Sequence, residues 1–196
     1  MAGGAALALD FSLLENQLLS RFGPARVNLL RDWQQLLNSG ASEQEKLKLV
    51  NSFFNRNIQF DDDQNIWNQS DYWATPLETI GKGRGDCEDF ALAKYYSLLH
   101  MGIPMNRLRL IYVKARQGNL QQAHMVLAYY PQPNATPLVL DNLDPSIKNA
   151  SQRPDLTPVF SFNGEGLWQG TGNKAANSKF SRWQELQMRA RSEGHR

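Results

Sequence analysis

The residues best suited to chemistry surround Cys87, the only cysteine among 196 residues. It lies in the stretch GKGRGDCEDFALAKYY, residues 81–96, with Asp86 before it and Glu88 and Asp89 after it. Asp86 and Asp89 have the spacing of a capping box, so the pattern predicts a helix that begins beside the cysteine. The unpaired amides and positive dipole of a helix start favour a thiolate and stabilise an oxyanion. These features predict a cysteine nucleophile.

A cysteine nucleophile needs a base, and the base needs a group that orients it. Among the three histidines, His100 is explained as a cation at the end of the predicted helix and His195 as a tail residue. His124 remains, on a predicted strand, and Asp141 closes the next predicted strand. This order of helix-borne cysteine, strand-borne histidine and next-strand aspartate fits papain-like and transglutaminase-like folds. We therefore predict a Cys87–His124–Asp141 triad, although each residue alone has an ordinary structural explanation.

The carboxylates beside Cys87 counteract the effect of the helix start, because their negative charge disfavours a thiolate. One unit charge at ~4 Å opposes the thiolate by about 1 to 4 kcal/mol, which matches or exceeds the benefit of a helix dipole. A bound cation removes this conflict, and the carboxylates of Asp86, Glu88 and Asp89 suit a hard ion such as calcium. The alternative is that Asp86 only caps the helix and the other two acids only complement its dipole.

A second acidic run, Asp61–Asp63, precedes this stretch. Its spacing does not match an EF-hand, so we predict a solvated turn rather than a cation site.

The patterns along the chain predict an α+β domain. Helical periodicity covers residues 11–57, whereas residues 58–85 have the composition of a long irregular loop. After the helix that begins at Asp86, alternating patterns predict three strands, at 107–115, 123–131 and 137–143. An amphipathic helix is predicted at 178–191. We expect one domain over residues 12–191, a flexible remnant at 1–11 and a frayed tail at 192–196.

Composition argues against several classes of protein. A net charge of +2 without any Lys/Arg-rich run argues against nucleic-acid binding. No apolar run approaches the ~20 residues of a membrane span. A single cysteine rules out an internal disulfide framework.

Four segments closely resemble the bacterial transglutaminase-like cysteine proteinases: DYWATPLETIGKGRGDCEDFALAKYYSLLHMGIP, RLRLIYVKA, AHMVLAYYP and LDNLDP. The resemblance extends from about residue 12 to residue 190. It implies a papain/transglutaminase-like fold in which N-terminal helices and a Cys-bearing central helix pack on an antiparallel sheet. It also implies the roles of the site residues, with Cys87 as nucleophile, His124 as base, Asp141 as orienting group, Asp86 and Glu88 as calcium ligands, and Asp89 as a third ligand.

The resemblance further implies a calcium-dependent endopeptidase of the periplasm. Such an enzyme cleaves the N-terminal region of a large surface adhesin, typically beside paired alanines, and so releases the adhesin from biofilm cells. A LapD-like inner-membrane receptor that binds cyclic di-GMP sequesters the proteinase. Periplasmic localisation rests on the resemblance, because no intact signal peptide is visible and we expect the N-terminus to be trimmed or redesigned.

Two other functions remain open at this point. A transglutaminase or acyltransferase uses the same triad but passes the acyl group to an amine instead of water. A non-catalytic calcium-binding domain uses the helices and the Trp-rich loop as an interaction surface. For Trp73 in that loop, the alternatives are a place beside the substrate cleft or the receptor interface, and a place in the core.

Overall fold

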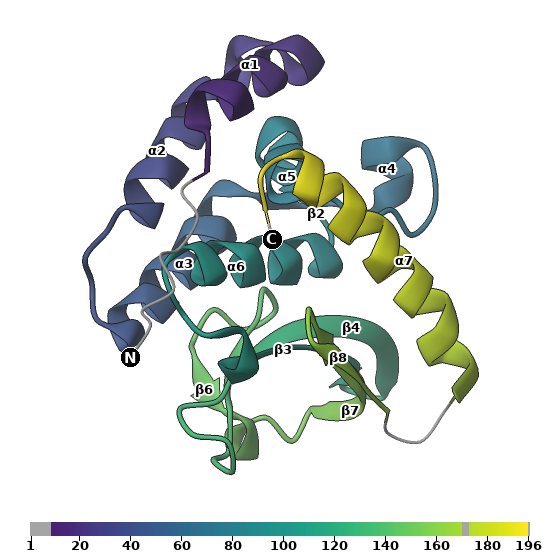
Figure 1. Ribbon diagram of the computed structural model, residues 1–196. Coiled ribbons are helices and arrows are strands. Elements are labelled where there is room, and N and C mark those ends of the chain that lie inside the picture. The colour runs from purple at the N-terminus through teal and green to yellow at the C-terminus, as the bar shows by residue number, and fades with distance from the viewer. Residues whose placement is uncertain (1–8, 170–172, 196) are drawn as a thin grey trace.

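The computed structural model describes residues 9–169 and 173–195 (Figure 1). Its helices are α1 Phe11–Phe22, α2 Val27–Leu37, α3 Glu43–Asn57, α4 Asp63–Trp67, α5 Pro76–Lys82, α6 Cys87–His100 and α7 Asn173–Ser192. Its strands are β1 Gln59–Phe60, β2 Arg84–Gly85, β3 Leu108–Gln117, β4 Leu120–Tyr129, β5 Leu138–Leu140, β6 Lys148–Asn149, β7 Leu156–Asn163 and β8 Gly166–Gln169. Three short 3₁₀ helices occur at Pro24–Arg26, Met105–Arg107 and Ala150–Gln152.

Capping explains where the helices near the site begin. The predicted capping box of α6 is confirmed, since the side chain of Asp86 accepts from the backbone of Asp89 and the side chain of Asp89 accepts from the backbone of Asp86. The same device starts α5, where Thr75 and Glu78 form a capping box around Pro76 at the first helical position. Residues 58–85 are therefore more regular than their composition indicates.

The larger sheet is antiparallel, with strand order β6-β5-β4-β3-β7-β8. Its centre is the β3–β4 hairpin, whose turn uses Gly118 at a φ of 61°, a left-handed conformation that favours glycine. The three strands predicted after residue 106 are confirmed as β3, β4 and β5. Strands β1 and β2 form a separate parallel pair that joins Gln59 to Arg84 and Phe60 to Gly85.

The helices lie on one side of the larger sheet, and α7 runs along its flank past β8 (Figure 1). Helix α6 packs against β3 and β4, where Leu110, Met125 and Leu127 belong to the main buried core. The predicted α+β class, with a Cys-bearing central helix on an antiparallel sheet, is confirmed. A smaller apolar cluster of Val113, Val126 and Val139 is separate from this core.

Both ends of the described chain differ from the expected flexible segments. Leu9 is buried and lies against Gly194, and α1 begins at Phe11. Glu193 and His195 are also buried, so these two residues of the expected frayed tail pack against the fold. The physical reason is that polar partners lie within reach: Thr75 and Arg21 donate to the Glu193 carboxylate.

The final histidine has a similar explanation. His195 Nδ1 lies 2.7 Å from His100 Nε2, and its ring packs on Tyr96. His100 at the end of α6 is thus one half of a histidine pair, a contact that the sequence does not predict. Trp73 is 1% exposed and stacks on Phe162, which makes it a core residue rather than part of an interaction surface.

Candidate active site

Cys87 is the first residue of α6, as the sequence predicts. Its half-buried thiol donates a 3.0 Å hydrogen bond to Glu88 Oε2, and the sulfur accepts a hydrogen bond from the backbone amide of Met125 on β4. Burial, followed by the charges of Glu88 and Asp86, raises the pKa of the thiol well above its ordinary value. Cys87 therefore lies at a helix start, which favours a thiolate, but burial and the neighbouring carboxylates favour the protonated thiol.

His124 and Asp141 form a buried pair next to this helix start. His124 Nε2 donates to Asp141 Oδ1 at 2.6 Å, and both side chains are at most 4% exposed. The strand pairing β4–β5 explains the contact, because Asp141 directly follows β5, whose partner is the strand that carries His124. With Nε2 engaged by Asp141, Nδ1 is the ring nitrogen left for a thiol, since neutral imidazole has one donor and one acceptor.

Arg153 holds the far side of the Asp141 carboxylate. Its Nη2 donates to Asp141 Oδ2 at 2.8 Å, and the Leu143 amide donates to Oδ1 at 3.1 Å. Burial alone raises the pKa of Asp141, but the hydrogen bonds from His124 and Arg153 outweigh burial and lower this pKa to about 2. Asp141 is therefore a carboxylate at any physiological pH. Sequence reasoning did not select Arg153, which lies in a loop without a motif.

Cys87 and the His124–Asp141 pair are neighbours without a direct bond. The amide that contacts the cysteine sulfur belongs to Met125, the residue that follows His124. Among the described hydrogen bonds, the thiol bonds to Glu88 and not to His124. Thiol and imidazole of a cysteine hydrolase often approach only when substrate binds, so the geometry is compatible with a triad.

Three carboxylates converge beside the cysteine. One ligand oxygen from each of Asp63, Asp86 and Asp89 lies within 4.8 Å of the other two. Burial, together with the neighbouring charges, raises the pKa of Asp63 to about 6 and that of Asp86 to about 12, and burial also raises the pKa of Asp89. Such shifts mean that the three charges repel one another unless protons or a cation separate them.

The cluster fits a calcium ion by its own chemistry. Calcium takes carboxylate oxygens at about 2.3 to 2.6 Å, so oxygens on opposite sides of one ion lie about 5 Å apart. Asp63 Oδ1 is buried without a hydrogen-bond partner, whereas its Oδ2 accepts from the Tyr72 amide at 2.6 Å. An oxygen left unpaired in this position is available to a metal.

The cluster differs in one member from the predicted ligand set. The structure brings Asp86 and Asp89 together with Asp63, while Glu88 lies outside the cluster and bonds to Cys87. Asp63 is 6% exposed, so the interpretation of Asp61–Asp63 as a solvated turn fails at its last residue. The parallel β1–β2 pair explains this convergence, because it fixes residues 59–60 beside residues 84–85 and so brings both acidic runs together.

Comparison with protein families decides which class of enzyme this site belongs to. Residues 13–155 match the family described as bacterial transglutaminase-like cysteine proteinase. The chain belongs to this family. Membership confirms the resemblance noted in the sequence and supports a cysteine protease.

Solved structures of the family agree with this conclusion. The chain is similar to Legionella pneumophila LapG, with 37% identity and a TM-score of 0.78 over 92% of this chain and 97% of that chain. It is also similar to EGTA-treated LapG (36% identity, TM-score 0.78, 92% and 97% covered) and to calcium-bound LapG (37% identity, TM-score 0.76, 91% and 98% covered). No curated protein sequence matches the chain. These likenesses confirm the transglutaminase-like fold.

Among the described residues, no helix is long and apolar enough to cross a membrane.

Proposed function

We propose that this protein is a calcium-dependent cysteine endopeptidase with Cys87, His124 and Asp141 as its catalytic triad. The observation that carries the proposal is the buried His124–Asp141 hydrogen bond beside the helix start that presents Cys87. Membership of the bacterial transglutaminase-like cysteine proteinases supports it.

In this mechanism Cys87 attacks the scissile carbonyl, and His124 Nδ1 takes the thiol proton. Asp141 stabilises the imidazolium and holds its ring in the tautomer that faces the thiol. The unpaired amides of the first turn of α6 stabilise the oxyanion. His124 then returns its proton to the leaving amine, and water hydrolyses the thioester.

Asp63, Asp86 and Asp89 would hold the calcium ion. When bound, the ion would supply the positive charge that offsets the repulsion among the three carboxylates. One of these carboxylates, Asp86, directly precedes the nucleophile in the chain. The solved structures of calcium-bound and EGTA-treated LapG support calcium as the ion for this family member.

A substrate and a mode of control are proposed on the same basis of resemblance. We propose cleavage of the N-terminal region of a large biofilm adhesin near paired alanines, in the periplasm, with sequestration by a LapD-like cyclic di-GMP receptor. The likeness to LapG over nearly the whole chain supports this assignment.

The decisive test incubates the protein with an adhesin N-terminal fragment, with calcium or with EGTA. We expect cleavage with calcium only, and no cleavage by Cys87→Ala at unchanged circular dichroism. Retained cleavage by Cys87→Ala would contradict the nucleophile, and equal cleavage in EGTA would contradict calcium dependence. Mass spectrometry of the products separates hydrolysis from amide cross-links, which an acyltransferase would form.

A further inference from the structure

Lys94, on the helix that carries Cys87, is a buried ammonium group that the proposed triad does not use. Its side chain is 1% exposed. It lies seven residues after Cys87, so two helical turns place both side chains on the same side of α6. Burying an ammonium group is costly unless it is hydrogen-bonded and faces a negative charge. The groups around Lys94 show what offsets this cost.

Asn55 on α3 connects Lys94 to the triad. Lys94 Nζ donates to Asn55 Oδ1 at 2.8 Å, and Asn55 Nδ2 donates to the backbone carbonyl oxygen of Asp141 at 2.9 Å. Because an ammonium group can only donate, the lysine fixes which end of the amide faces Asp141. The main chain from which the Asp141 carboxylate projects is thus tied to the helix that carries Cys87.

The charge of Asp141 offsets part of the cost of burying Lys94. Burial lowers the pKa of Lys94 to about 7, and the negative charge of Asp141 acts in the opposite direction. The Phe90 ring, whose centre lies 5.7 Å from Nζ, also favours a cation. Lys94 therefore carries a positive charge on the acid side of neutral pH.

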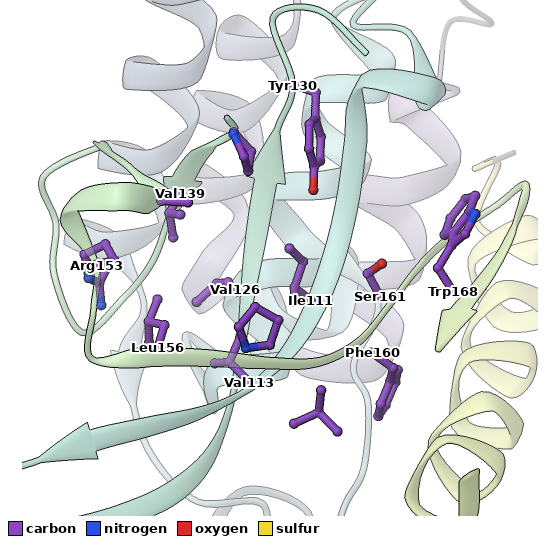
Figure 2. A pocket seen from close by; sticks show the side chains of 14 residues that line it. Ile111, Val113, Val126, Tyr130, Val139, Arg153, Leu156, Phe160, Ser161 and Trp168 are labelled. Atoms are coloured by element: carbon purple, nitrogen blue, oxygen red, sulfur yellow. The ribbon is translucent and has the colours of Figure 1, made fainter. Parts of the chain in front are cut away.

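Arg153 approaches Asp141 from another direction. It lines a cavity of about 430 Å³ over the separate apolar cluster of the sheet, and Figure 2 shows Arg153 at one end of this cavity and Trp168 at the other. Lys94 does not line the cavity, because it lies on α6, which packs on the main core. Asp141 is therefore flanked by two buried cations, Arg153 in direct contact and Lys94 through Asn55.

Two cations beside one carboxylate affect the base of the triad. The groups that face His124 and Asp141 are Arg153, Lys94 and the protonated Cys87 thiol at the start of α6. Asp141 alone would favour an imidazolium on its neighbour, and an imidazolium cannot take the proton of the thiol. Each cation opposes a further positive charge on His124 and so favours the neutral imidazole that general-base catalysis needs.

We propose that Lys94 is a positioning residue for His124, the base of the proposed triad. Its ammonium group orients Asn55, which holds the main chain of Asp141, and its charge keeps the resting imidazole neutral. This inference rests on the proposed function. The burial of Lys94 and the hydrogen bonds that join α6 through α3 to Asp141 support it.

NMR titration of the His124 ring in the Cys87→Ala protein tests this role without any activity measurement. Lys94→Met removes the buried charge, so the midpoint of the His124 titration should move to higher pH by about 0.5 to 1 unit. Lys94→Arg keeps the charge and should restore most of the original titration. In the enzyme with Cys87, Lys94→Met should lower kcat several-fold more at pH 6 than at pH 8.5, where Lys94 is largely neutral.

Lys46→Met is the matched control. Lys46 lies on α3 and donates to the carbonyl oxygen of Met101 at 2.7 Å, at the opposite end of α6 from Cys87. The same substitution removes an equal charge there and should leave the His124 titration unchanged. If Lys94→Met does not fold, the titrations of Lys94 and His124 are followed in the Cys87→Ala protein. Each curve should then be broadened over the pH range in which the other group titrates.

Three results would overturn the proposal. The first is an unchanged His124 midpoint in Lys94→Met, which a purely structural lysine would give. The second is an equal shift in Lys46→Met or in Lys94→Arg, and the third is independent titration of Lys94 and His124. If the midpoint moves as expected but the enzyme with Cys87 cleaves no peptide bond, the proposed endopeptidase function fails and the role of Lys94 stands.

Discussion

At the scale of single residues, Arg153 keeps the Asp141 carboxylate of the His124–Asp141 pair ionised. It contacts the Asp141 oxygen that His124 leaves free, and the two donors keep the pKa of Asp141 at about 2 despite burial. Catalysis by the proposed triad needs this carboxylate ionised, because it stabilises the imidazolium. Arg153 is therefore a positioning residue for the base.

Replacing Arg153 should impair turnover more than substrate binding. Losing one charge-assisted hydrogen bond costs about 1.5 to 3 kcal/mol, so we expect Arg153→Met to lower kcat by about 10- to 100-fold with KM nearly unchanged. The pKa of Asp141 should rise, which moves the acid limb of the kcat profile to higher pH. Arg153→Lys should restore part of kcat, and Asp155→Asn is the control. A pure loss of folded protein, without any shift of the acid limb, would contradict this role.

Asp63 is the second residue with a sharp prediction. Because Asp63 belongs to the carboxylate cluster and Glu88 does not, Asp63→Asn should weaken calcium binding by at least about 10-fold, and Glu88→Gln should weaken it less. Isothermal titration measures both. Asp62→Asn, one residue away and exposed, is the matched control. Equal losses in Asp62→Asn and Asp63→Asn would place the ion elsewhere.

At the scale of elements, the helices and strands that carry the triad were predictable from sequence patterns. The approach of the three aspartates of the carboxylate cluster to one another was not. The Asp86–Asp89 capping box and the alternation in β3 and β4 predicted the helix and strands that carry Cys87 and His124. The start signals of α5, which are Thr75, Pro76 and Glu78, are also present in the sequence, but they lie in a segment whose composition is typical of a loop. The acidic run that contains Asp63 was visible in the sequence, but its approach to the start of α6 was not, because the β1–β2 pair that places it has two residues per strand and is too short to leave a pattern.

The buried residues that follow α7 predict how the free energy of unfolding depends on pH. Burial, and then the charge of His100, lower the pKa of His195 from 6.5 to about 3, so the unfolded chain binds a proton between these values and the folded protein does not. His195 therefore destabilises the fold as pH falls below 6.5, by up to about 1.4 kcal/mol per pH unit.

Urea unfolding at pH 7 and pH 5 tests this sign. His195→Phe should lose less stability than the original protein on acidification. Glu193 acts in the opposite direction, because burial raises its pKa to about 7 and its folded form gains a proton as pH falls from 7 to 4.5. Glu193→Gln should therefore make acidification more destabilising. An identical pH dependence in all three proteins would contradict the docked arrangement of residues 193–195.

At the scale of the whole molecule, a calcium ion would link α4 to the start of α6. A ligand that binds only the folded state at 100 times its dissociation constant adds about 2.7 kcal/mol, which for a protein of this size raises Tm by about 5 to 10 °C. Thermal unfolding with calcium, with magnesium and with EGTA measures the effect. Magnesium should stabilise less, because it demands a smaller octahedral shell. Equal Tm values in calcium and EGTA would contradict the site.

The fold class was predictable from the sequence, whereas contacts between segments distant in the sequence were not. Periodicity and the order Cys87, His124, Asp141 predicted an α+β domain with the cysteine helix packed on a sheet, because such patterns record which face of each element is buried. The cavity and the burial of His195 depend on contacts between distant segments, such as Arg153 with Asp141 or His100 with His195. No local pattern reports such contacts.

Trp168 offers an optical reporter. Of five tryptophans, Trp33, Trp73 and Trp183 are at most 2% exposed, whereas Trp168 is 37% exposed on the cavity rim with the Arg109 guanidinium 3.9 Å from its ring centre. A collisional quencher in water should reach Trp168 far more readily than the buried rings. Trp67 is half-buried with the Lys82 ammonium 4.9 Å from its ring centre, so iodide also reaches it. In a Trp67→Phe variant, iodide drawn by the Arg109 charge should therefore extinguish mainly the Trp168 emission, and an occupant of the cavity should shield it. The protein thus carries a label for its own cavity without chemical modification.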